Sequence, residues 1–324
     1  MLDLSNEFAI GIDIGGTNTK YGLVNHRGEI LQKGEIKTDS FQEVEDFVDA
    51  LYEVLTPIIK ENVEDGKVKG IGVGAPNGNF YTGTIEYAPN LHWKGIVPVT
   101  KLVTQKFGLP SALTNDANAA AVGEMNYGAA RGMRDFIMIT LGTGVGSGIV
   151  ANGQLILGHD GFAGELGHTV IRPGGRKHWS TMLDGSLEAY CSATGITMTA
   201  KELMEQHPDV ECMMRKYNDK DLDSKCIFEC AEKGDALALE TYRFTGQILG
   251  EALANFIMFS SPQAIILFGG VIKAGDYIMD PTREHMEKNL LPIFQNKVKL
   301  VFSELKEADA AILGASALVW DLRE

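Results

Sequence analysis

Two glycine-rich segments carry the residue types that bind phosphate groups. The first, Asp13-Ile14-Gly15-Gly16-Thr17-Asn18-Thr19-Lys20, follows an apolar run that begins at Phe8. Glycine lets main-chain N–H groups approach phosphate oxygens, threonine hydroxyls can add hydrogen bonds, and Asp13 could hold Mg²⁺ through water. The segment has neither the GxxxxGK[ST] pattern of a P-loop nor the GxGxxG pattern of a dinucleotide fold. Taken alone, it is equally compatible with an ordinary hairpin turn.

The second segment is Leu141-Gly142-Thr143-Gly144-Val145-Gly146-Ser147-Gly148. This density of glycine exceeds what one tight turn requires, and successive amides form an anion-binding nest. We expect Gly142, Thr143 and Gly144 to face the β- and γ-phosphates of a nucleotide. A flexible loop between two strands is the alternative.

A third segment, Asn115-Asp116-Ala117-Asn118, places a carboxylate at a strand-to-helix junction. Phosphoryl transfer needs a proton acceptor within hydrogen-bond reach of the attacking hydroxyl, and Asp116 suits that role. The alternative is that Asp116 merely caps the helix beginning at Ala117. The two roles can coexist, and the local sequence does not decide between them.

Acidic and imidazole groups gather in a fourth segment, Gly164-Glu165-Leu166-Gly167-His168, and Glu188 follows it. A sugar presents a ring of hydroxyls that donate and accept hydrogen bonds, and carboxylates together with an imidazole satisfy such a ring. The HExxH pattern of a metallohydrolase is absent from this segment.

The elements that position these residues follow from apolar patterning. Phe8–Ile14 and Tyr21–Val24 predict two strands of a hairpin joined by the first glycine turn. The same pattern recurs roughly 130 residues later, which indicates a duplicated phosphate-binding hairpin, one in each domain. The returning strand of this second copy is expected to begin at Ile149.

Further elements are predicted around the two hairpins. Asp39-Ser40 is expected to cap the first helix, from about Phe41 to Glu61. The remaining predictions are helices at Val97–Phe107, Ala117–Tyr127 and Ala236–Met258, and strands at Val68–Gly74, Ser111–Thr114 and Ala264–Phe268.

Composition narrows the class of protein. A chain of 324 residues with 44% hydrophobic residues favours two domains. The formal charge of −14, without a Lys/Arg run, opposes nucleic-acid and anionic-membrane partners. We expect no signal peptide, membrane span or helix-turn-helix module before the first strand. Four scattered cysteines fit a reducing cytoplasm.

Together, these segments resemble the ROK family of sugar kinases and repressors, within the hexokinase and actin superfamily, and most of all its bacterial glucokinases. The resemblance extends from Phe8 to about Leu318 and includes Pro89-Asn90-Leu91-His92-Trp93 and Phe268-Gly269-Gly270-Val271. It implies an α/β fold of two actin-like, ribonuclease H-like domains with a cleft between them. The implied small domain comprises residues 1–114 with 309–324, and the large domain comprises residues 115–308.

The resemblance also implies an ATP- and Mg²⁺-dependent hexose kinase that converts glucose to glucose 6-phosphate in glycolysis, and a homo-oligomer, either dimer or tetramer. Kinases for another hexose or an N-acetylhexosamine, and a non-catalytic sugar-sensing regulator, are the alternatives. Asp116 is the implied catalytic base. The implied sugar-binding residues are Asn90, Asn115, Asp116, Glu165, His168 and Glu188. The implied nucleotide-binding residues are Asp13, Gly15, Gly16, Thr17, Gly142, Thr143, Gly144, Gly269 and Gly270.

The sequence departs from the family pattern at two places. Most members have a cysteine cluster that binds a structural zinc, whereas residues 175–186 contain no cysteine here. We therefore predict no zinc and expect packing to hold the sugar-binding loop, with His168 free for the sugar. A metal bound by His168 and His178 is the minority alternative. Asn77 stands where the family commonly has glycine, and Asn tolerates the left-handed backbone that glycine would supply.

Overall fold

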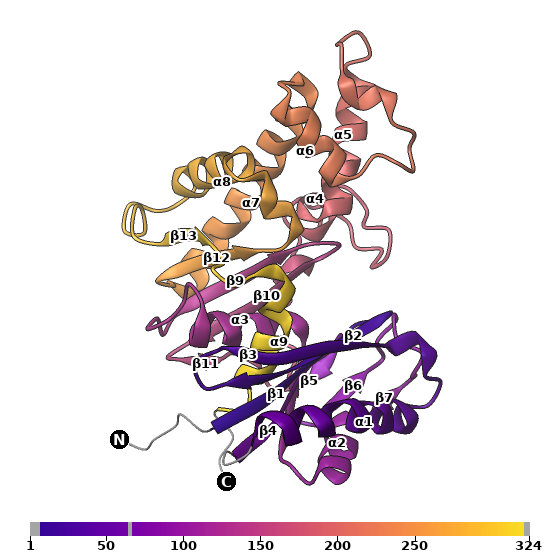
Figure 1. Cartoon of the computed structure of the whole chain (residues 1–324). Coiled ribbons are helices and arrows are strands. Elements are labelled where there is room, and N and C mark those ends of the chain that lie inside the picture. The colour runs from indigo at the N-terminus through magenta and orange to yellow at the C-terminus, as the bar shows by residue number, and fades with distance from the viewer. Residues whose placement is uncertain (1–6, 64–66, 321–324) are drawn as a thin grey trace. The chain divides into compact units, whose positions relative to one another are not determined.

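The computed structural model describes residues 7–63 and 67–320, which form two compact units. Unit 1 contains the chain up to residue 134, residues 148–164 and the chain from residue 303, and unit 2 contains residues 135–147 and 165–302. Figure 1 follows the chain through both units. The domain boundaries inferred from the sequence stay a prediction.

Unit 1 is built on a five-stranded sheet with the order β3-β2-β1-β4-β8. Strand β1 pairs antiparallel with β2 and parallel with β4, and β4 pairs parallel with β8. The predicted first hairpin and the strands predicted at Val68–Gly74 and Ser111–Thr114 are therefore confirmed. The strands are β1 (Glu7–Ile14), β2 (Asn18–Asn25), β3 (Ile30–Lys37), β4 (Lys67–Gly74) and β8 (Ser111–Thr114).

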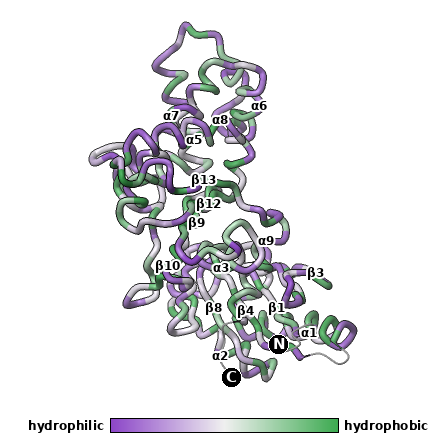
Figure 2. The backbone as a smooth tube through the Cα atoms, turned by 90° about the vertical axis from the view of Figure 1, so that its left-hand side faces the viewer, coloured by the Kyte–Doolittle hydropathy of each residue, from purple (hydrophilic) through white to green (hydrophobic). Residues whose placement is uncertain are grey.

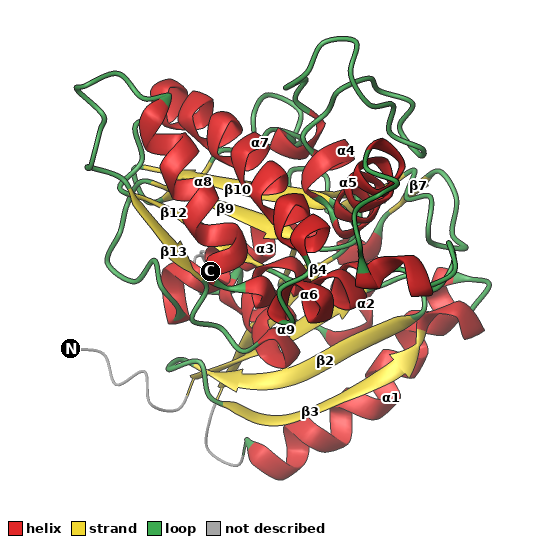
Figure 3. Ribbon diagram, turned by 90° about the horizontal axis from the view of Figure 1, so that it is seen from above, coloured by secondary structure: helices red, strands yellow, loops and turns green. Residues whose placement is uncertain are grey.

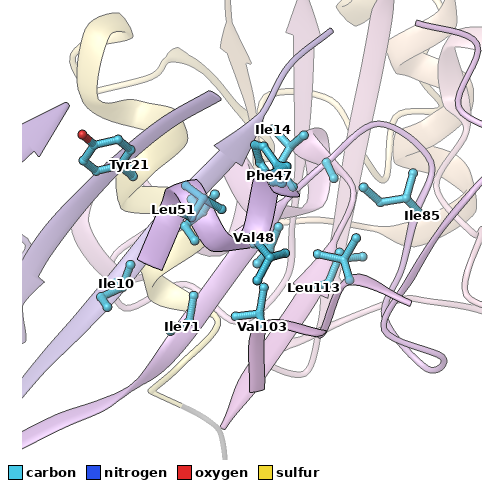
Figure 4. Packing of buried hydrophobic residues seen from close by; sticks show 14 of the residues in the cluster. Ile10, Ile14, Tyr21, Phe47, Val48, Leu51, Ile71, Ile85, Val103 and Leu113 are labelled. Atoms are coloured by element: carbon cyan, nitrogen blue, oxygen red, sulfur yellow. The ribbon is translucent and has the colours of Figure 1, made fainter. Parts of the chain in front are cut away.

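One face of this sheet is covered by α1 (Val44–Asn62) and α2 (Val99–Phe107). Their apolar residues meet the inward residues of the strands in one continuous core, in which Phe47 and Ile10 are fully buried. Figure 4 shows Phe47 beside Ile14 in this core. The alternation of buried and exposed positions along α1 follows its helical period, so the sequence pattern fixes which side of the helix packs.

The other face carries α9 (Glu307–Ala317), which packs on β1 and β4 and against α3 (Asp116–Tyr127). A side chain at Gly11 would overlap the carbonyl oxygen of Ile312, so the helix lies directly on the strand backbone. Three short strands, β5 (Gly78–Asn79), β6 (Thr84–Glu86) and β7 (Ile96–Val97), form a separate small sheet.

The second five-stranded sheet has the order β11-β10-β9-β12-β13, and β9, β12 and β13 run parallel. Figure 2 shows hydrophobic colouring along β9 and β12. Figure 3 distinguishes these strands from the helices of unit 2. The strands are β9 (Phe136–Leu141), β10 (Val145–Ala151), β11 (Gln154–Leu155), β12 (Ala264–Phe268) and β13 (Lys299–Phe302). The helices are α4 (Glu188–Cys191), α5 (Ala193–Gln206), α6 (Ser224–Glu232), α7 (Ala236–Ser260) and α8 (Asp276–Lys288).

Two local predictions were wrong. Helix α1 begins at Val44, and Asp39 and Ser40 lie in a separate 3-10 turn at residues 38–40. The backbone N–H of Thr38 donates to the carbonyl of Thr17, which holds this turn to the first hairpin and away from the helix. In the second hairpin, β10 begins at Val145, so the turn itself comprises only residues 142–144.

The α/β class predicted from the sequence is confirmed by both sheets and their helices. Asn77 has a φ of 51°, as its left-handed tolerance predicted. Its amide nitrogen donates to the carbonyl of Glu86 at 3.0 Å, so its polar contact lies within the small sheet region. None of the helices within residues 7–63 and 67–320 combines the length and apolar character of a membrane span.

Candidate functional site

The first glycine turn presents two adjacent backbone amides. The N–H of Gly15 donates to the carbonyl of Asn18 at 3.0 Å, which closes the turn. Among the described residues, no oxygen accepts a hydrogen bond from the amides of Gly16 and Thr17. Thr17 is exposed at the tip of this turn. The geometry suits an anion that lacks hydrogen-bond donors, such as a phosphate.

Asn90 lies against this turn. A Cβ atom on Gly16 would come within 2.6 Å of the Asn90 carbonyl oxygen, so only glycine permits this approach. The Asn90 side chain is exposed, whereas its neighbours Leu91 and Trp93 are buried and anchor the loop. The Trp93 ring packs on Phe47 with ring centroids 4.7 Å apart. The structure thus places Asn90 beside the first turn.

Asp13 is the last-but-one residue of β1 and faces the same end of the sheet. It lies opposite Gly74 of the parallel neighbour β4 and opposite Lys20 of β2. Burial and the nearby charge of Asp116 raise its pKa to about 6 from 3.8, while Lys20 acts in the opposite direction. Its carboxylate accepts no hydrogen bond from any part of the chain that the structure describes. An acid that accepts no hydrogen bond in this way is suited to a cation that offsets its desolvation.

Asn115 caps α3, which resolves the ambiguity left by the sequence. The Asn115 Oδ1 atom accepts from the Asn118 backbone N–H at 2.7 Å. Asp116 is therefore the first helical residue and is exposed; its Oδ1 accepts only from the adjacent Ala117 N–H at 2.9 Å. No described residue donates to its second oxygen. Because the strands β1, β4 and β8 are parallel, Asp13 and Asp116 emerge at the same edge of the sheet.

The second glycine turn repeats this arrangement within unit 2. The Gly142 N–H donates to the Gly144 carbonyl at 3.0 Å, which closes the turn. The amides of Thr143 and Gly144 have no acceptor among residues 7–63 and 67–320. The next amides are occupied: Val145 donates to Glu188 and Gly146 donates to Thr140. The sequence predicts that Gly142, Thr143 and Gly144 face phosphate groups. In the structure, only the amides of Thr143 and Gly144 are available to a ligand.

Glu188 lies beneath the second turn. Its Oε2 accepts from the Val145 N–H at 2.8 Å, and its Oε1 lies 3.2 Å from Nε2 of His178. Both residues are buried, with 9% and 6% of their surface exposed. The predicted contact of Glu188 with a sugar stays a prediction.

Glu165 and His168 are brought together on the surface of unit 2. Glu165 Oε2 lies 3.8 Å from Nε2 of His168, and both side chains are more than one-third exposed. The Nδ1 atom of His168 is buried and has no hydrogen-bond partner among the described residues. Close to this pair, the Leu166 N–H donates to Ser147 Oγ at 3.1 Å, so the segment is tied to the start of β10.

Gly269 and Gly270 follow β12, at the end of the sheet where the second turn also lies. Strand β12 runs parallel to β9, with Phe268 opposite Thr140. Gly269 has a φ of 110°, and a side chain there would overlap the Leu141 carbonyl oxygen. The space above Gly270 is open within the described structure. The predicted nucleotide-side glycines therefore adjoin the second turn.

Sequence reasoning missed Arg176, which organises the region after His168. Its guanidinium donates to the carbonyls of Ala189 and Gly195 and forms a bidentate pair with Glu202. It also stacks on the Tyr190 ring at 4.6 Å. An arginine without a surrounding motif gives no sequence signal for such a role.

The minority reading of a metal held by His168 and His178 receives no support from the contacts of His178. Its Nε2 faces Glu188, and its Nδ1 lies 3.3 Å from the Thr181 backbone nitrogen. No group of three or more potential ligands suited to a metal ion occurs among the described residues. The prediction of no structural zinc stays a prediction.

The chain was compared with known protein families and structures. Residues 9–321 match a family model described as ROK family. A glucokinase of Halalkalibacterium halodurans is 35% identical over 321 residues, which are 98% of this chain and 96% of that protein. A xylose repressor of Caldicellulosiruptor bescii is 29% identical over 313 residues, which are 96% of this chain and 77% of that protein.

A solved structure is also similar in fold. It is a ROK family glucokinase from Streptomyces griseus in complex with glucose and AMPPNP, with 31% sequence identity and a TM-score of 0.75. The alignment covers 96% of this chain and 98% of that one. These comparisons confirm the resemblance and the actin-like fold class that the sequence motifs indicated.

Proposed function

The chain belongs to the ROK family, and from that premise we propose that it is a glucokinase that transfers the γ-phosphoryl group of ATP to the 6-hydroxyl of glucose. Its enzyme class is that of an ATP-dependent sugar kinase. The observation that carries the proposal is that the helix cap and the proposed proton acceptor are two different, neighbouring residues at the start of α3. Asn115 caps the helix and so leaves one oxygen of Asp116 available to accept a proton from the substrate.

In this mechanism the amides of Gly16, Thr17, Thr143 and Gly144 bind the phosphate oxygens of ATP. Asp116 accepts the proton of the attacking hydroxyl as the bond to phosphorus forms. Asn90, Asn115, Glu165, His168 and Glu188 are proposed to position the sugar by hydrogen bonds. Gly269 and Gly270 are proposed to adjoin the nucleoside of ATP.

Mg²⁺ is proposed as the metal of the reaction, and its chemistry is to offset the charge of the ATP phosphates. The residues of unit 1 fit such a cation. Asp13 is a desolvated carboxylate with a raised pKa and no hydrogen-bond donor within the described chain. We propose that Asp13 holds the hydrated ion through water, because a carboxylate of this kind gains more from a cation than from solvent.

A kinase for mannose, fructose or an N-acetylhexosamine is the first alternative, because the sugar-contacting residues do not distinguish these substrates. A sugar-sensing regulator is the second alternative, and the similarity of the chain to a xylose repressor supports it. The cytoplasm, a role in glycolysis and a homo-oligomeric state belong to the same proposal. The four cysteines, all free in the structure, are compatible with a reducing compartment.

The test is ADP release measured with glucose, mannose, fructose, N-acetylglucosamine and N-acetylmannosamine side by side. We expect glucose to give the highest kcat/KM. Asp116→Asn should lower kcat by about two orders of magnitude or more while glucose binding persists, because only proton acceptance is lost.

Asp39→Asn is a matched control, since Asp39 is an exposed acid of the same unit outside the proposed site. Near-normal turnover of Asp116→Asn would reject the assignment of the base. Sugar binding without sugar-dependent ADP release would instead favour the regulator.

A further inference from the structure

A buried pair of polar side chains lies under the second glycine turn. Among the described residues of unit 2, three with an imidazole or carboxylate side chain are buried: His178, Glu188 and Asp235. The Nε2 atom of His178 and the Oε1 atom of Glu188 are 3.2 Å apart. Burying two such groups is unfavourable unless each has a polar partner. The contacts of this pair therefore constrain the structure around it.

The surrounding contacts define how the imidazole is protonated. Its Nδ1 faces the Thr181 backbone N–H at 3.3 Å and the Thr181 hydroxyl at 3.2 Å. A backbone N–H can only donate, so Nδ1 is the acceptor and the ring proton resides on Nε2. In the neutral tautomer the protonated nitrogen is therefore Nε2, which lies 3.2 Å from Oε1 of Glu188, and no charged imidazolium is required.

Glu188 in turn contacts the second glycine turn. Its other oxygen, Oε2, accepts from the Val145 N–H at 2.8 Å. A Cβ atom on Gly144 would come within 2.5 Å of the same oxygen, so the turn rests directly on the carboxylate. The Val145 amide follows immediately after the two amides, of Thr143 and Gly144, that are available to a ligand.

The Val145 peptide is held from its other side by the sugar-binding segment. Gly167 packs so closely on the Val145 carbonyl oxygen that any side chain at residue 167 would overlap it. Gly167 lies between Glu165 and His168, the predicted sugar-contacting pair. The backbone of one residue, Val145, thus contacts Glu188 through its N–H and Gly167 through its carbonyl.

The loop that carries His178 is itself fixed. The His178 N–H donates to the Leu183 carbonyl at 2.8 Å, and Lys177 pairs with Asp184 by an antiparallel bridge. Arg176, at the base of this loop, is anchored by Ala189, Gly195 and Glu202 as described above. The imidazole is consequently presented to Glu188 by a rigid loop and not by a freely rotating side chain.

We propose that His178 is a positioning residue for nucleotide binding: it fixes Glu188, which in turn fixes the amides of the second glycine turn. The proposal rests on the proposed kinase function, which it deepens by assigning the support of the ATP-binding turn. It also identifies the packing that holds the loop where the family's cysteine cluster is missing.

The experiment compares His178→Gln with His178→Asn. A glutamine can place its amide N–H near the position of Nε2, whereas an asparagine reaches only the level of Nδ1. Lys177→Ala is the control, because Lys177 is an exposed neighbour in the same loop. Each protein is assayed for the KM of ATP and of glucose, and separately for the Kd of AMPPNP with Mg²⁺.

We expect His178→Asn to raise the KM of ATP and the Kd of AMPPNP by about tenfold, as for loss of a hydrogen bond to a charged group. His178→Gln should stay within about threefold of the wild type, because it keeps the donor. Hydrogen exchange should accelerate at the Val145 amide in the asparagine variant only. Lys177→Ala should behave as the wild type in every assay.

Unchanged nucleotide binding in His178→Asn would overturn the proposal, even if its melting temperature fell, because a merely structural role predicts that pattern. Equal defects in the glutamine and asparagine variants would also overturn it, since the Nε2 donor would then be irrelevant. A wild type without sugar-dependent ADP release would reject the kinase function. The AMPPNP comparison would still decide the role of His178 in that case.

Discussion

The two glycine turns present the same pair of free amides but manage their acidic neighbours in opposite ways. In the first, the acid is Asp13, two residues before the turn, and its carboxylate has no hydrogen-bond donor among the described residues. The equivalent residue of the second turn is Thr140, whose hydroxyl accepts from the Gly146 N–H. The acid there is Glu188, from a distant helix, and both of its oxygens are engaged.

In the proposed kinase, this difference would correspond to two separate uses of negative charge near the phosphates of ATP. An unpaired carboxylate that is costly to ionise is available for a cation brought by the substrate. A carboxylate with a protein partner on each oxygen can in addition hold a backbone in place. We therefore propose that the first turn serves the metal and that the second is held rigid by Glu188, although the two loops look alike in sequence.

The strongest test of this comparison is Asp13→Asn. It removes the charge proposed to hold Mg²⁺, and we expect kcat/KM at pH 8 to fall by about a hundredfold. The wild-type activity should rise with pH through a group of pKa about 6, which is the ionisation of Asp13, and the variant should lack this limb. The pH dependence of kcat/KM measures both. Retention of the limb in the variant would assign it to another residue.

The same substitution should stabilise the fold, which separates a functional residue from a structural one. The folded pKa of Asp13 lies above its ordinary 3.8, so the native state binds the proton more tightly than the unfolded state. The free energy of unfolding therefore falls as the pH rises from about 4 to 6, and the loss persists above pH 6. Asp13→Asn avoids this loss and should gain up to about 3 kcal/mol at pH 8, and less towards pH 4. Urea unfolding at both pH values tests the sign.

The second turn is tested by two alanine substitutions of the same chemistry. A Cβ atom on Gly144 would meet Glu188 at 2.5 Å, whereas one on Gly142 would meet nothing within 4 Å. Because buried His178 prevents Glu188 from moving aside, Gly144→Ala should raise the KM of ATP by about tenfold. Gly142→Ala is the matched control and should change it by less than about threefold. Equal effects of the two would show that Glu188 does not support the turn.

The sequence predicts those features of the two turns that depend on residues close together in the chain. Both hairpins and the helix at Asp116 follow from short apolar runs broken by glycine, and the structure contains each of them. Whether Asp116 caps that helix was undecided, because Asn115 and Asp116 are both good caps, and only the geometry of the turn assigns Asn115. The extent of the second turn was misjudged because Gly146 and Gly148 lie within a strand.

The support of the second turn was beyond local reasoning. Glu188 meets Val145 across 43 residues of chain, and the sequence motif around Glu188 indicated a sugar contact. His178 could be noticed as a potential ligand, but its burial and its partner depend on how the loop at residues 176–185 folds back. Similarly, the cap expected at Asp39 failed because Thr38 is bonded to the first hairpin, a tertiary contact without a local signature.

The smallest expected effect concerns the threonine at each turn. Thr17 and Thr143 each supply one of the two available amides of their turn and are both exposed, and their hydroxyls have no partner within the described chain. Replacing each by the isosteric valine should raise the KM of ATP by about threefold to fivefold, as for one exposed hydrogen bond to a phosphate. Because Glu188 holds the second turn in place, the effect of Thr143→Val on the free energy of AMPPNP binding should add to the effects of other substitutions in that turn. Thr17→Val, beside the unpaired Asp13, should instead alter the dependence on Mg²⁺ concentration. Identical Mg²⁺ titrations of the two variants would contradict the assignment of the metal to the first turn alone.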